Sequence, residues 1–202
     1  MKILNAYSGL GGNRKFWTPN GNDHEITAIE LDPKIAKIYQ DFFPNDKMVV
    51  GDAHQYLLEH YKEYDFIWSS PPCPSHSRIR NEAGIGCGQN KPIYPDMKLY
   101  EEIVFLQHMT KMGFYKGKFC VENVISYYPP LVPPQNIGQH YFWTNFQIAT
   151  IDIKSRGHFL NNKGLMKIKG FEVNDRKLLR NCVEPETGKH ILDCALNPNT
   201  LL

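Results

Sequence analysis

The architecture of this chain follows from Asp65-Phe-Ile-Trp-Ser-Ser-Pro-Pro-Cys-Pro-Ser-His-Ser-Arg78, in which an apolar run ends in two prolines and a cysteine. The aromatic and β-branched residues of this run are typical of a buried strand. The two prolines cannot continue a sheet ladder, so the chain must leave the sheet in an extended form. Cys73 is therefore expected at the carboxyl end of a strand, where open α/β sheets bind their ligands. The alternative is a buried cysteine that packs as a small apolar group.

Near the start of the chain, a β-prone run from Lys2 to Tyr7 breaks at Ser8-Gly-Leu-Gly-Gly12, and Asn13 to Trp17 is expected to start a helix. Glycines let the backbone bend tightly and approach a ligand closely, which is why such turns bind nucleotides and similar cofactors. The spacing is not that of G-x-G-x-x-G, so a purely structural turn remains an alternative.

The next unit is a predicted strand, His24 to Glu30, followed by a helix from Lys34 to Phe43 with Asp32 as its N-cap and Pro33 in its first turn. Glu30 ends this strand about 20 residues after the glycine turn, where dinucleotide folds place the acid that binds ribose hydroxyls. The alternative is a solvated charge at a strand end.

A third unit has a short strand, Lys47 to Val50, then Gly51-Asp52 and a helix from Ala53 to His60. Asp52 is expected to bind an adenine amino group, to cap the helix, or to do both. Because short strands alternate with helices of about ten residues, the sequence predicts an α/β fold with a doubly wound, mostly parallel sheet.

Downstream of Cys73, residues 75–95 have little apolar periodicity and predict a long functional loop that folds over a substrate. A helix is expected over Asp96 to Gly113, with Asp96 as its N-cap. Its expected core positions are Leu99, Ile103, Leu106, Met109 and Met112.

Lys118 to Val124 predicts a fifth strand whose tip carries Glu122 and Asn123, and the proline-rich stretch from Tyr127 to Gln135 predicts a rigid connector. An aromatic strand is expected over residues 140–150. The excess of basic residues over residues 154–169 predicts a loop that contacts phosphates, or else ordinary exposed lysines.

The tail from Asn174 to Leu196 shows two helical patches split at Pro185 and Gly188. Three cysteines outside the Pro-Pro-Cys segment are expected to be buried packing residues: Cys120, Cys182 and Cys194.

The composition of the 202 residues, with a net charge of +2, fits one domain and permits nucleic acid as a partner without requiring it. Five cysteines without framework spacing and no signal peptide indicate a reducing cytosol, so a cytoplasmic location is expected. No apolar run approaches the roughly 20 residues needed to span a bilayer, so no membrane partner is expected.

Together these motifs resemble the cytosine-C5 methyltransferases that use S-adenosylmethionine, in an order and spacing that agree over residues 1 to about 125. The resemblance rests on Tyr7-Ser-Gly-Leu-Gly-Gly12, Glu30 with Asp32, Gly51-Asp52, Ser70-Pro-Pro-Cys-Pro-Ser-His-Ser-Arg78 and Val121-Glu-Asn-Val124. It implies a Rossmann-like methyltransferase sheet. The cofactor residues that it implies are Tyr7, Ser8, Gly9, Leu10, Gly11, Gly12, Glu30, Leu31, Asp52, Ala53, Ser70 and Pro71.

The resemblance also implies a mechanism without a metal. Cys73 would add to C6 of cytosine as the nucleophile, which makes C5 able to take the methyl group. Glu122 would assist at N3, and Asn123 would hold the proline–cysteine loop. A base in duplex DNA would first have to be flipped out of the stack.

The chain departs from the family after its fifth strand. The family usually shows there a glutamine followed by two alternating arginines that contact the substrate, whereas this chain has Gly138-Gln-His-Tyr-Phe-Trp-Thr144. Either Arg78 or Arg80 is expected to compensate for the missing arginines, or the activity is expected to be altered.

The expected domains are a catalytic and cofactor-binding domain over residues 1–150 and a short C-terminal extension over 151–202, which would serve as a reduced recognition element on the same domain. Because little of the chain is left for target recognition, specificity is expected to be limited or to come from a partner chain or from residues 154–170. The first expectation for function is methylation of cytosine in DNA, with restriction–modification as one setting. The alternatives are methylation of RNA and a non-catalytic protein that binds cofactor or DNA.

Overall fold

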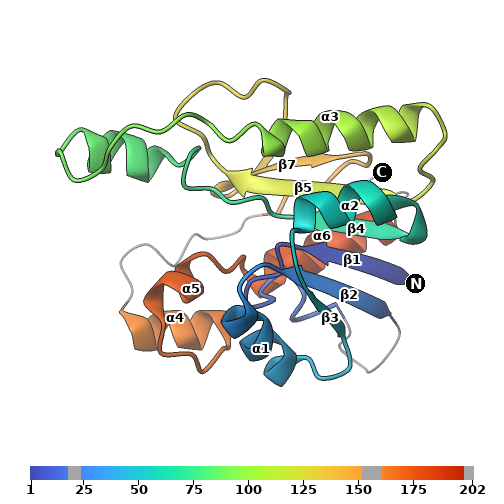
Figure 1. Ribbon diagram of the computed structural model, residues 1–202, viewed down its shortest axis with the longest axis horizontal. Coiled ribbons are helices and arrows are strands. Elements are labelled where there is room, and N and C mark those ends of the chain that lie inside the picture. Colours follow the sequence, from blue (N-terminus) through green and yellow to red (C-terminus); the bar gives the residue numbers. More distant parts are fainter. Residues whose placement is uncertain (18–23, 152–160, 198–202) are drawn as a thin grey trace.

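A seven-stranded mixed sheet runs through the computed structural model, which describes residues 1–17, 24–151 and 161–197 (Figure 1). Its strand order is β3-β2-β1-β4-β5-β7-β6. Strands β1 to β5 pair in parallel, and β7 pairs antiparallel with β5 and β6. The strands are β1 (Lys2–Ala6), β2 (Glu25–Glu30), β3 (Lys47–Val50), β4 (Phe66–Ser69), β5 (Lys118–Val124), β6 (Gln135–Ile137) and β7 (His140–Thr144).

This order confirms the predicted doubly wound, mostly parallel sheet. The chain runs outward from β1 to β3 and then returns to place β4 on the other side of β1. In such sheets the carboxyl ends of the two strands at the reversal flank a crevice where ligands bind. The helices are α1 (Pro33–Phe42), α2 (Ala53–His60), α3 (Lys98–Lys111), α4 (Asn162–Lys169), α5 (Arg176–Arg180) and α6 (Pro185–Leu196).

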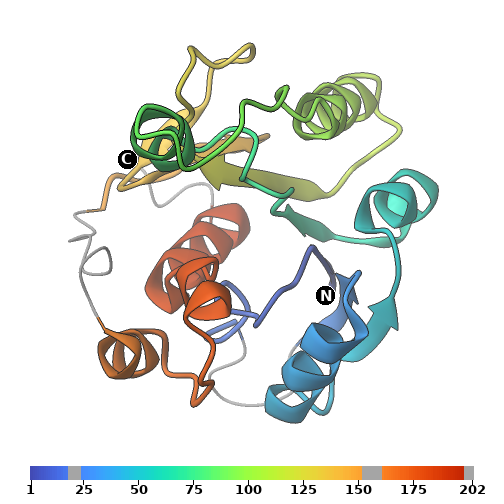
Figure 2. The ribbon, with the colours of Figure 1, turned by 60° about the vertical axis from the view of Figure 1, so that its left-hand side comes forward.

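Alternate residues of each central strand enter different cores. In β4, Ile67 packs with the cluster that holds α2 and α3, while Phe66 and Trp68 pack with the cluster that holds Ile191 and Leu192 of α6. Figure 2 shows α2 and α3 on one side of the sheet and α6 on the other. The tail of the chain therefore covers one face of the central sheet.

The expected helix at Asn13–Trp17 is wrong, because these residues form successive turns. The side chain of Asn13 donates to Asn5 Oδ1 of β1 at 2.7 Å, and the indole of Trp17 donates to the carbonyl oxygen of Gly188 at 3.0 Å. Trp17 also packs its ring against Phe66. These contacts with β1 and α6 take the place of a helical hydrogen-bond pattern.

Helix α1 begins as predicted, because Asp32 accepts the Lys34 amide at 2.8 Å and Pro33 occupies the first turn. Asp52 caps α2 in the same way through His54 N, at 2.9 Å. Helix α3 differs slightly: Asp96 accepts the amide of Lys98, but the N-cap residue is Met97.

Several boundaries differ from the predictions. Met112 of the expected α3 core is exposed, and the expected loop over 75–95 contains a π-helix, η2 (Ile79–Ile85). The aromatic strand stops at Thr144, since the next side chain, that of Asn145, accepts from Phe119 N and ends the ladder.

The predicted basic loop over 154–169 is partly wrong, because residues 162–169 form α4, which buries Lys169. Lys154 and Arg156 lie outside the described residues. In the tail, Pro185 begins α6 and Gly188 lies inside it, so the break precedes both. Cys120, Cys182 and Cys194 are buried, as predicted.

A bilayer-spanning helix would have to be longer and more apolar than any found in residues 1–17, 24–151 and 161–197.

Candidate active site

The carboxyl ends of the parallel strands open into a cavity of about 1290 Å³. Its walls come from the turn after β1, the ends of β2 and β3, the proline–cysteine loop after β4 and the tip of β5. Residues from α4, α5 and the start of α6 close the opposite side. The cavity therefore lies at the reversal of strand order.

The loop that carries Cys73 is held on both sides. Asn123 at the tip of β5 donates its side-chain amide to the carbonyl oxygen of Pro71 at 2.9 Å. After the cysteine, the amides of His76 and Ser77 both donate to the Cys73 carbonyl oxygen at 3.0 Å. The cysteine is thus fixed in a turn at the cavity wall.

The Cys73 side chain is half-buried in this wall. Burial, and after it the nearby charge of Glu122, raise the pKa of its thiol to about 11. The resting group at neutral pH is therefore the thiol, and a reaction that needs the thiolate must first remove its proton.

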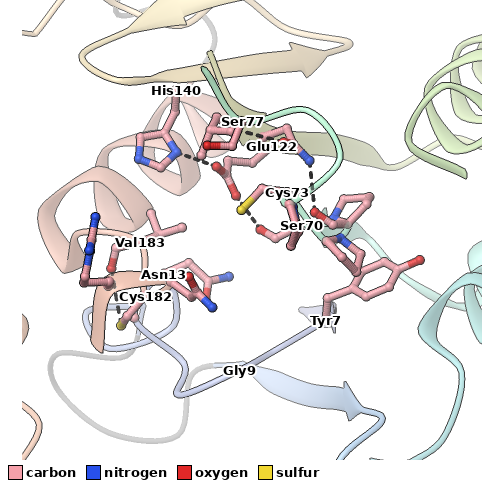
Figure 3. A pocket seen from close by; sticks show the side chains of 18 of the residues that line it. Tyr7, Gly9, Asn13, Ser70, Cys73, Ser77, Glu122, His140, Cys182 and Val183 are labelled. Atoms are coloured by element: carbon pink, nitrogen blue, oxygen red, sulfur yellow. Dashed lines mark hydrogen bonds and ion pairs between the residues drawn. The ribbon is translucent and has the colours of Figure 1, made fainter. Parts of the chain in front are cut away.

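Glu122 is buried beside this cysteine, as Figure 3 shows. Its Oε2 accepts a hydrogen bond from Ser70 Oγ at 2.7 Å, and Ser70 in turn accepts from the Trp68 indole at 2.7 Å. Its Oε1 lies 2.5 Å from His140 Nδ1. Both carboxylate oxygens therefore have hydrogen-bond partners within the protein.

His140 belongs to the site, although the sequence interpretation gave it no role. It begins β7 and pairs with Val124 at the tip of β5, so the antiparallel ladder brings its ring to Glu122. The other ring nitrogen, Nε2, lies 3.9 Å from Oε2 of Glu184. Glu184 also forms an ion pair with buried Lys169, at 2.8 Å. Neither α4 nor the start of α6 could be related to Glu122 from sequence spacing.

The turn after β1 has the backbone conformation of a ligand-binding loop. Tyr7 has a φ of 57° and Gly9 a φ of 52°, in the left-handed region that non-glycine residues rarely adopt. The Tyr7 hydroxyl donates to buried Glu102 at 2.7 Å, which fixes this conformation. His54 and Ser69 also bond to Glu102, so one carboxylate ties α3 to β1, β4 and α2.

Two acidic residues at neighbouring strand ends face the same turn. Glu30 accepts the amide of Gly9 at 3.0 Å and that of Asp32 at 3.0 Å. Asp52 caps α2 and lies 3.6 Å from the Lys98 ammonium, an ion pair at the cavity edge. Burial would raise the pKa of Asp52, but the helix amides and Lys98 hold it below its ordinary value.

The residues fit a cofactor that combines a hydroxylated ring with a charged end. Glu30 and Asp52 both line the cavity, and Gly9 leaves open space where a side chain would stand. Among the described residues, the buried Ser8 hydroxyl has no hydrogen-bond partner and lines the same cavity. An unpaired buried hydroxyl is costly, and a ligand would satisfy it.

The structure brings together most of the predicted site. The predicted residues that line the cavity are Cys73, Glu122, Asn123, Arg78, Tyr7, Ser8, Gly9, Leu10, Gly12, Glu30, Leu31, Asp52, Ala53, Ser70 and Pro71. Gly11 and Arg80 are not among the lining residues. Gly11 lies against the rings of Tyr39 and Phe43, and Arg80 donates to the carbonyl oxygen of Lys91 at 2.8 Å.

Basic residues of α5 also line the cavity, namely Arg176, Lys177 and Arg180. The charge of these residues was visible in the sequence, but their position opposite Cys73 depends on how the tail folds back over the sheet. Arg78 also lines the cavity and pairs with Glu82 at 3.4 Å.

Parts of this chain are similar in sequence to known proteins. The family model for C-5 cytosine-specific DNA methylase matches residues 1–104, just over half of the chain. A tRNA (cytosine(38)-C(5))-methyltransferase from Spodoptera frugiperda is 32% identical over 80 residues, which cover 38% of this chain and 24% of that protein. The type II methyltransferase M1.HgaI from Avibacterium volantium is 26% identical over 223 residues, covering 93% of this chain and 58% of that protein.

The matched part of this chain therefore spans about a quarter of the length of the tRNA methyltransferase and somewhat over half of the length of M1.HgaI. Among solved structures, a DNMT2 variant from Spodoptera frugiperda has a TM-score of 0.39 at 22% identity, covering 61% of this chain and 35% of that one. A putative methyltransferase, yhhF from Escherichia coli, has a TM-score of 0.39 at 15% identity, covering 71% and 73%. From the family match across the glycine turn, both acidic strand ends and the proline–cysteine loop, we conclude that the chain belongs to the C-5 cytosine-specific DNA methylase family.

Proposed function

We propose that this protein transfers a methyl group from S-adenosylmethionine to C5 of cytosine in DNA. The observation that carries the proposal is the placement of Cys73 beside Glu122 in the cavity, with Asn123 fixing the loop between them (Figure 3). Cys73 and Glu122 follow or end adjacent strands, so both can reach the same base. The thiol suits attack on the cytosine ring, and the carboxyl group suits proton exchange with it.

Cys73 acts on the base as a nucleophile. Its thiolate adds to C6 of cytosine, which forms the S–C6 bond and moves the ring electrons toward C5 and N3. C5 then takes the methyl group, a base removes the C5 proton, and elimination breaks the S–C6 bond and frees Cys73. Because the pKa of the thiol is about 11, loss of its proton is an early requirement of this sequence.

Glu122 stabilises the ring while the thiolate adds. It offers a proton or hydrogen bond at N3, which offsets the charge that builds there. Ser70 holds one of its oxygens, so the carboxyl group has little freedom to turn away. Asn123 keeps the cysteine loop at the tip of β5, which maintains the distance between the two reacting groups.

S-adenosylmethionine, when bound, supplies an electrophilic methyl group on a sulfonium. Glu30 would bind its ribose hydroxyls, Asp52 its adenine end, and Ser8 its charged amino-acid end. The backbone at Gly9 gives it close access to the turn. Support for this assignment is the unpaired Ser8 hydroxyl and the two acidic strand ends around one cavity.

Residues 151–202 would form the reduced recognition element of the protein. The basic residues of α5 support this proposal, since they line the same cavity as Cys73 and Arg78. Cations along the cavity suit a polyanionic strand whose flipped base enters it. A partner chain would supply any specificity beyond these contacts.

The test is a covalent trap. A DNA oligonucleotide containing 5-fluorocytosine, incubated with the protein and S-adenosylmethionine, should give an adduct on denaturing gels, because fluorine blocks the final elimination. Cys73→Ala should abolish the adduct, and Cys87→Ala, at an exposed cysteine outside the cavity, should leave it unchanged. An adduct that survives in Cys73→Ala contradicts the assignment.

RNA is the second candidate substrate, because the relative with 32% identity acts on tRNA. Parallel traps with 5-fluorocytosine in RNA and in tRNA separate the two substrates. Absence of a Cys73-dependent adduct on every nucleic acid would favour the non-catalytic alternative, a protein that binds cofactor or DNA without turnover.

A further inference from the structure

Four side chains form a row of alternating charge that leads from the reacting carboxyl group toward the tail of the chain. Glu122 on β5 contacts His140 on β7, His140 faces Glu184 before α6, and Glu184 pairs with Lys169 of α4. The four residues come from separate parts of the chain, and all of them line the cavity. The row is therefore built by the tertiary fold.

The position of His140 between two carboxylates favours its protonated form, the imidazolium. Nδ1 lies 2.5 Å from Glu122 and Nε2 lies 3.9 Å from Glu184. A neutral imidazole carries one N–H and would direct a lone pair at one of these carboxylates, whereas imidazolium carries a proton toward each. Burial alone would lower the pKa of His140, but the two carboxylates hold it above its ordinary value.

The groups that face His140 among the described residues are Glu122, Glu184 and Lys169. Lys169 opposes the charge on His140 but is paired with Glu184, and its ammonium also donates to the carbonyl oxygen of Cys182. The side chains of Glu122 and Lys169 are only 6% and 4% exposed, so these charges are poorly solvated and depend on one another.

The nearest proton for Glu122 is therefore the one on His140. The Ser70 hydroxyl accepts from the Trp68 indole and directs its own hydrogen to Glu122 Oε2. A serine hydroxyl does not give up its proton near neutral pH, whereas an imidazolium does. His140 thus has both the contact and the acidity to exchange a proton with Glu122.

We propose that His140 is a positioning residue that holds Glu122 and stores the proton which Glu122 lends to cytosine N3. This inference rests on the proposed function. As the thiolate of Cys73 bonds to C6, N3 takes a proton from the Glu122 carboxyl group, and Glu122 takes the Nδ1 proton of His140, which becomes neutral. On elimination the proton returns from N3 through Glu122 to His140, so the relay is unchanged after one turnover.

The first experiment measures the pKa of His140 in the protein without cofactor or nucleic acid. Imidazole resonances of the protein labelled in histidine are titrated by NMR, and His140 is assigned from the peak missing in His140→Gln. We expect a pKa above the ordinary value of about 6.5. Glu184→Gln removes the charge facing Nε2 and should lower that pKa, while Gln still accepts a hydrogen bond from Lys169.

The second experiment follows the rate of adduct formation with the 5-fluorocytosine oligonucleotide against pH. In the wild type the rate should rise with pH as Cys73 ionises and then level off once His140 loses its proton, because below a thiol pKa of about 11 the gain in thiolate offsets the loss of imidazolium. Glu184→Gln should move this break in the profile to lower pH by the same amount as the NMR titration, and His140→Gln should lack the break and react about 100-fold more slowly near pH 7. His60→Gln is the matched control, since His60 pairs with Glu63 at 2.7 Å on the surface.

Each outcome decides one claim. A His140 pKa at its ordinary value, or one that is unchanged in Glu184→Gln, would contradict the claim that His140 is held protonated between Glu122 and Glu184. A pH profile with the same shape in His140→Gln and wild type overturns the proton relay. If the wild type forms no adduct on DNA or RNA, the proposed function and the relay both fail, and the NMR titration still decides whether the charged row exists.

Discussion

Asn123 donates its side-chain amide to the carbonyl oxygen of Pro71 at 2.9 Å, so the strand tip that carries Glu122 also holds the loop that carries Cys73. The two groups with proposed chemical roles are 49 residues apart in sequence, yet this buried hydrogen bond and that of Ser70 to Glu122 connect their supports. The relative position of nucleophile and acid therefore depends on β4 and β5 remaining paired in register.

Asn123→Ala should leave the Pro71 carbonyl oxygen without its partner and loosen the cysteine loop. We expect stability to fall by about 1–3 kcal/mol, because a buried acceptor loses its hydrogen bond. The rate of Cys73 adduct formation should fall by roughly 100-fold through misplacement of the thiol. Denaturant unfolding and the 5-fluorocytosine trap measure these separately, and an unchanged adduct rate in a destabilised protein would contradict the positioning role.

Glu122→Gln should make Cys73 more reactive toward a small alkylating reagent. Burial and, to a smaller extent, the Glu122 charge raise the pKa of the thiol to about 11, so removing the charge lowers the pKa. Below pH 10, iodoacetamide labelling of Cys73 should be several-fold faster in the variant, with the wild-type rate rising about tenfold per pH unit. Mass spectrometry of the Cys73 peptide gives both rates. Equal rates would show that the two groups do not interact.

Tyr7→Phe should weaken cofactor binding without removing it. The variant loses the hydroxyl that bonds to Glu102, although the backbone stays in the strained left-handed conformation with a φ of 57°. We expect a loss of about 1–2 kcal/mol in stability and a several-fold weaker affinity for S-adenosylhomocysteine by calorimetry. Tyr94→Phe, at an exposed tyrosine outside the cavity, is the control and should change neither.

The pair of His54 and Glu102 should make stability depend on pH. Hydrogen bonding and charge from Glu102 raise the pKa of His54, against a smaller effect of burial. A histidine whose pKa is raised on folding contributes fully below its unfolded pKa of about 6.5, and that contribution is lost as pH rises through the folded pKa. The difference in melting temperature between wild type and His54→Gln should therefore shrink by roughly 2–3 °C from pH 6 to pH 9. A constant difference would mean that folding does not shift the pKa of His54.

Gly188→Ala should destabilise the protein strongly, although alanine has a higher helix propensity than glycine. A Cβ at this position in α6 would clash with the backbone of Asn13, which cannot move away as a flexible side chain could. We expect a loss of about 1–3 kcal/mol from overpacking. Gly51→Ala is the control, because a Cβ there meets nothing within 4 Å and should change stability by less than about 0.5 kcal/mol.

The strands and helices that depend on local signals could be predicted from the sequence. β3 has the predicted bounds, α1 has the predicted cap, and Cys73 follows a strand as its two prolines require. These features are set by residues that are neighbours in sequence, where hydrophobic periodicity and capping chemistry act directly.

The features that sequence reasoning missed depend on contacts between distant segments. Asn13–Trp17 forms turns because β1 and α6 bind its side chains, and no local pattern describes those partners. The contact of His140 with Glu122 depends on the antiparallel return of β7, and its contact with Glu184 depends on the path of the tail. The site was therefore predictable where its residues lie on parallel strand ends, and not where the tail completes it.

Helix α6 also determines when this protein can fold. The side chains of Phe66, Trp68 and Phe142 on one face of the sheet are covered by residues 185–196, which the ribosome makes long after β4. Until those residues leave the ribosome, an aromatic surface on the nascent sheet stays open to water and to chaperones or other chains. Closure of the core is consequently a late event in synthesis, and a chain stopped before Pro185 should be captured by chaperones or aggregate.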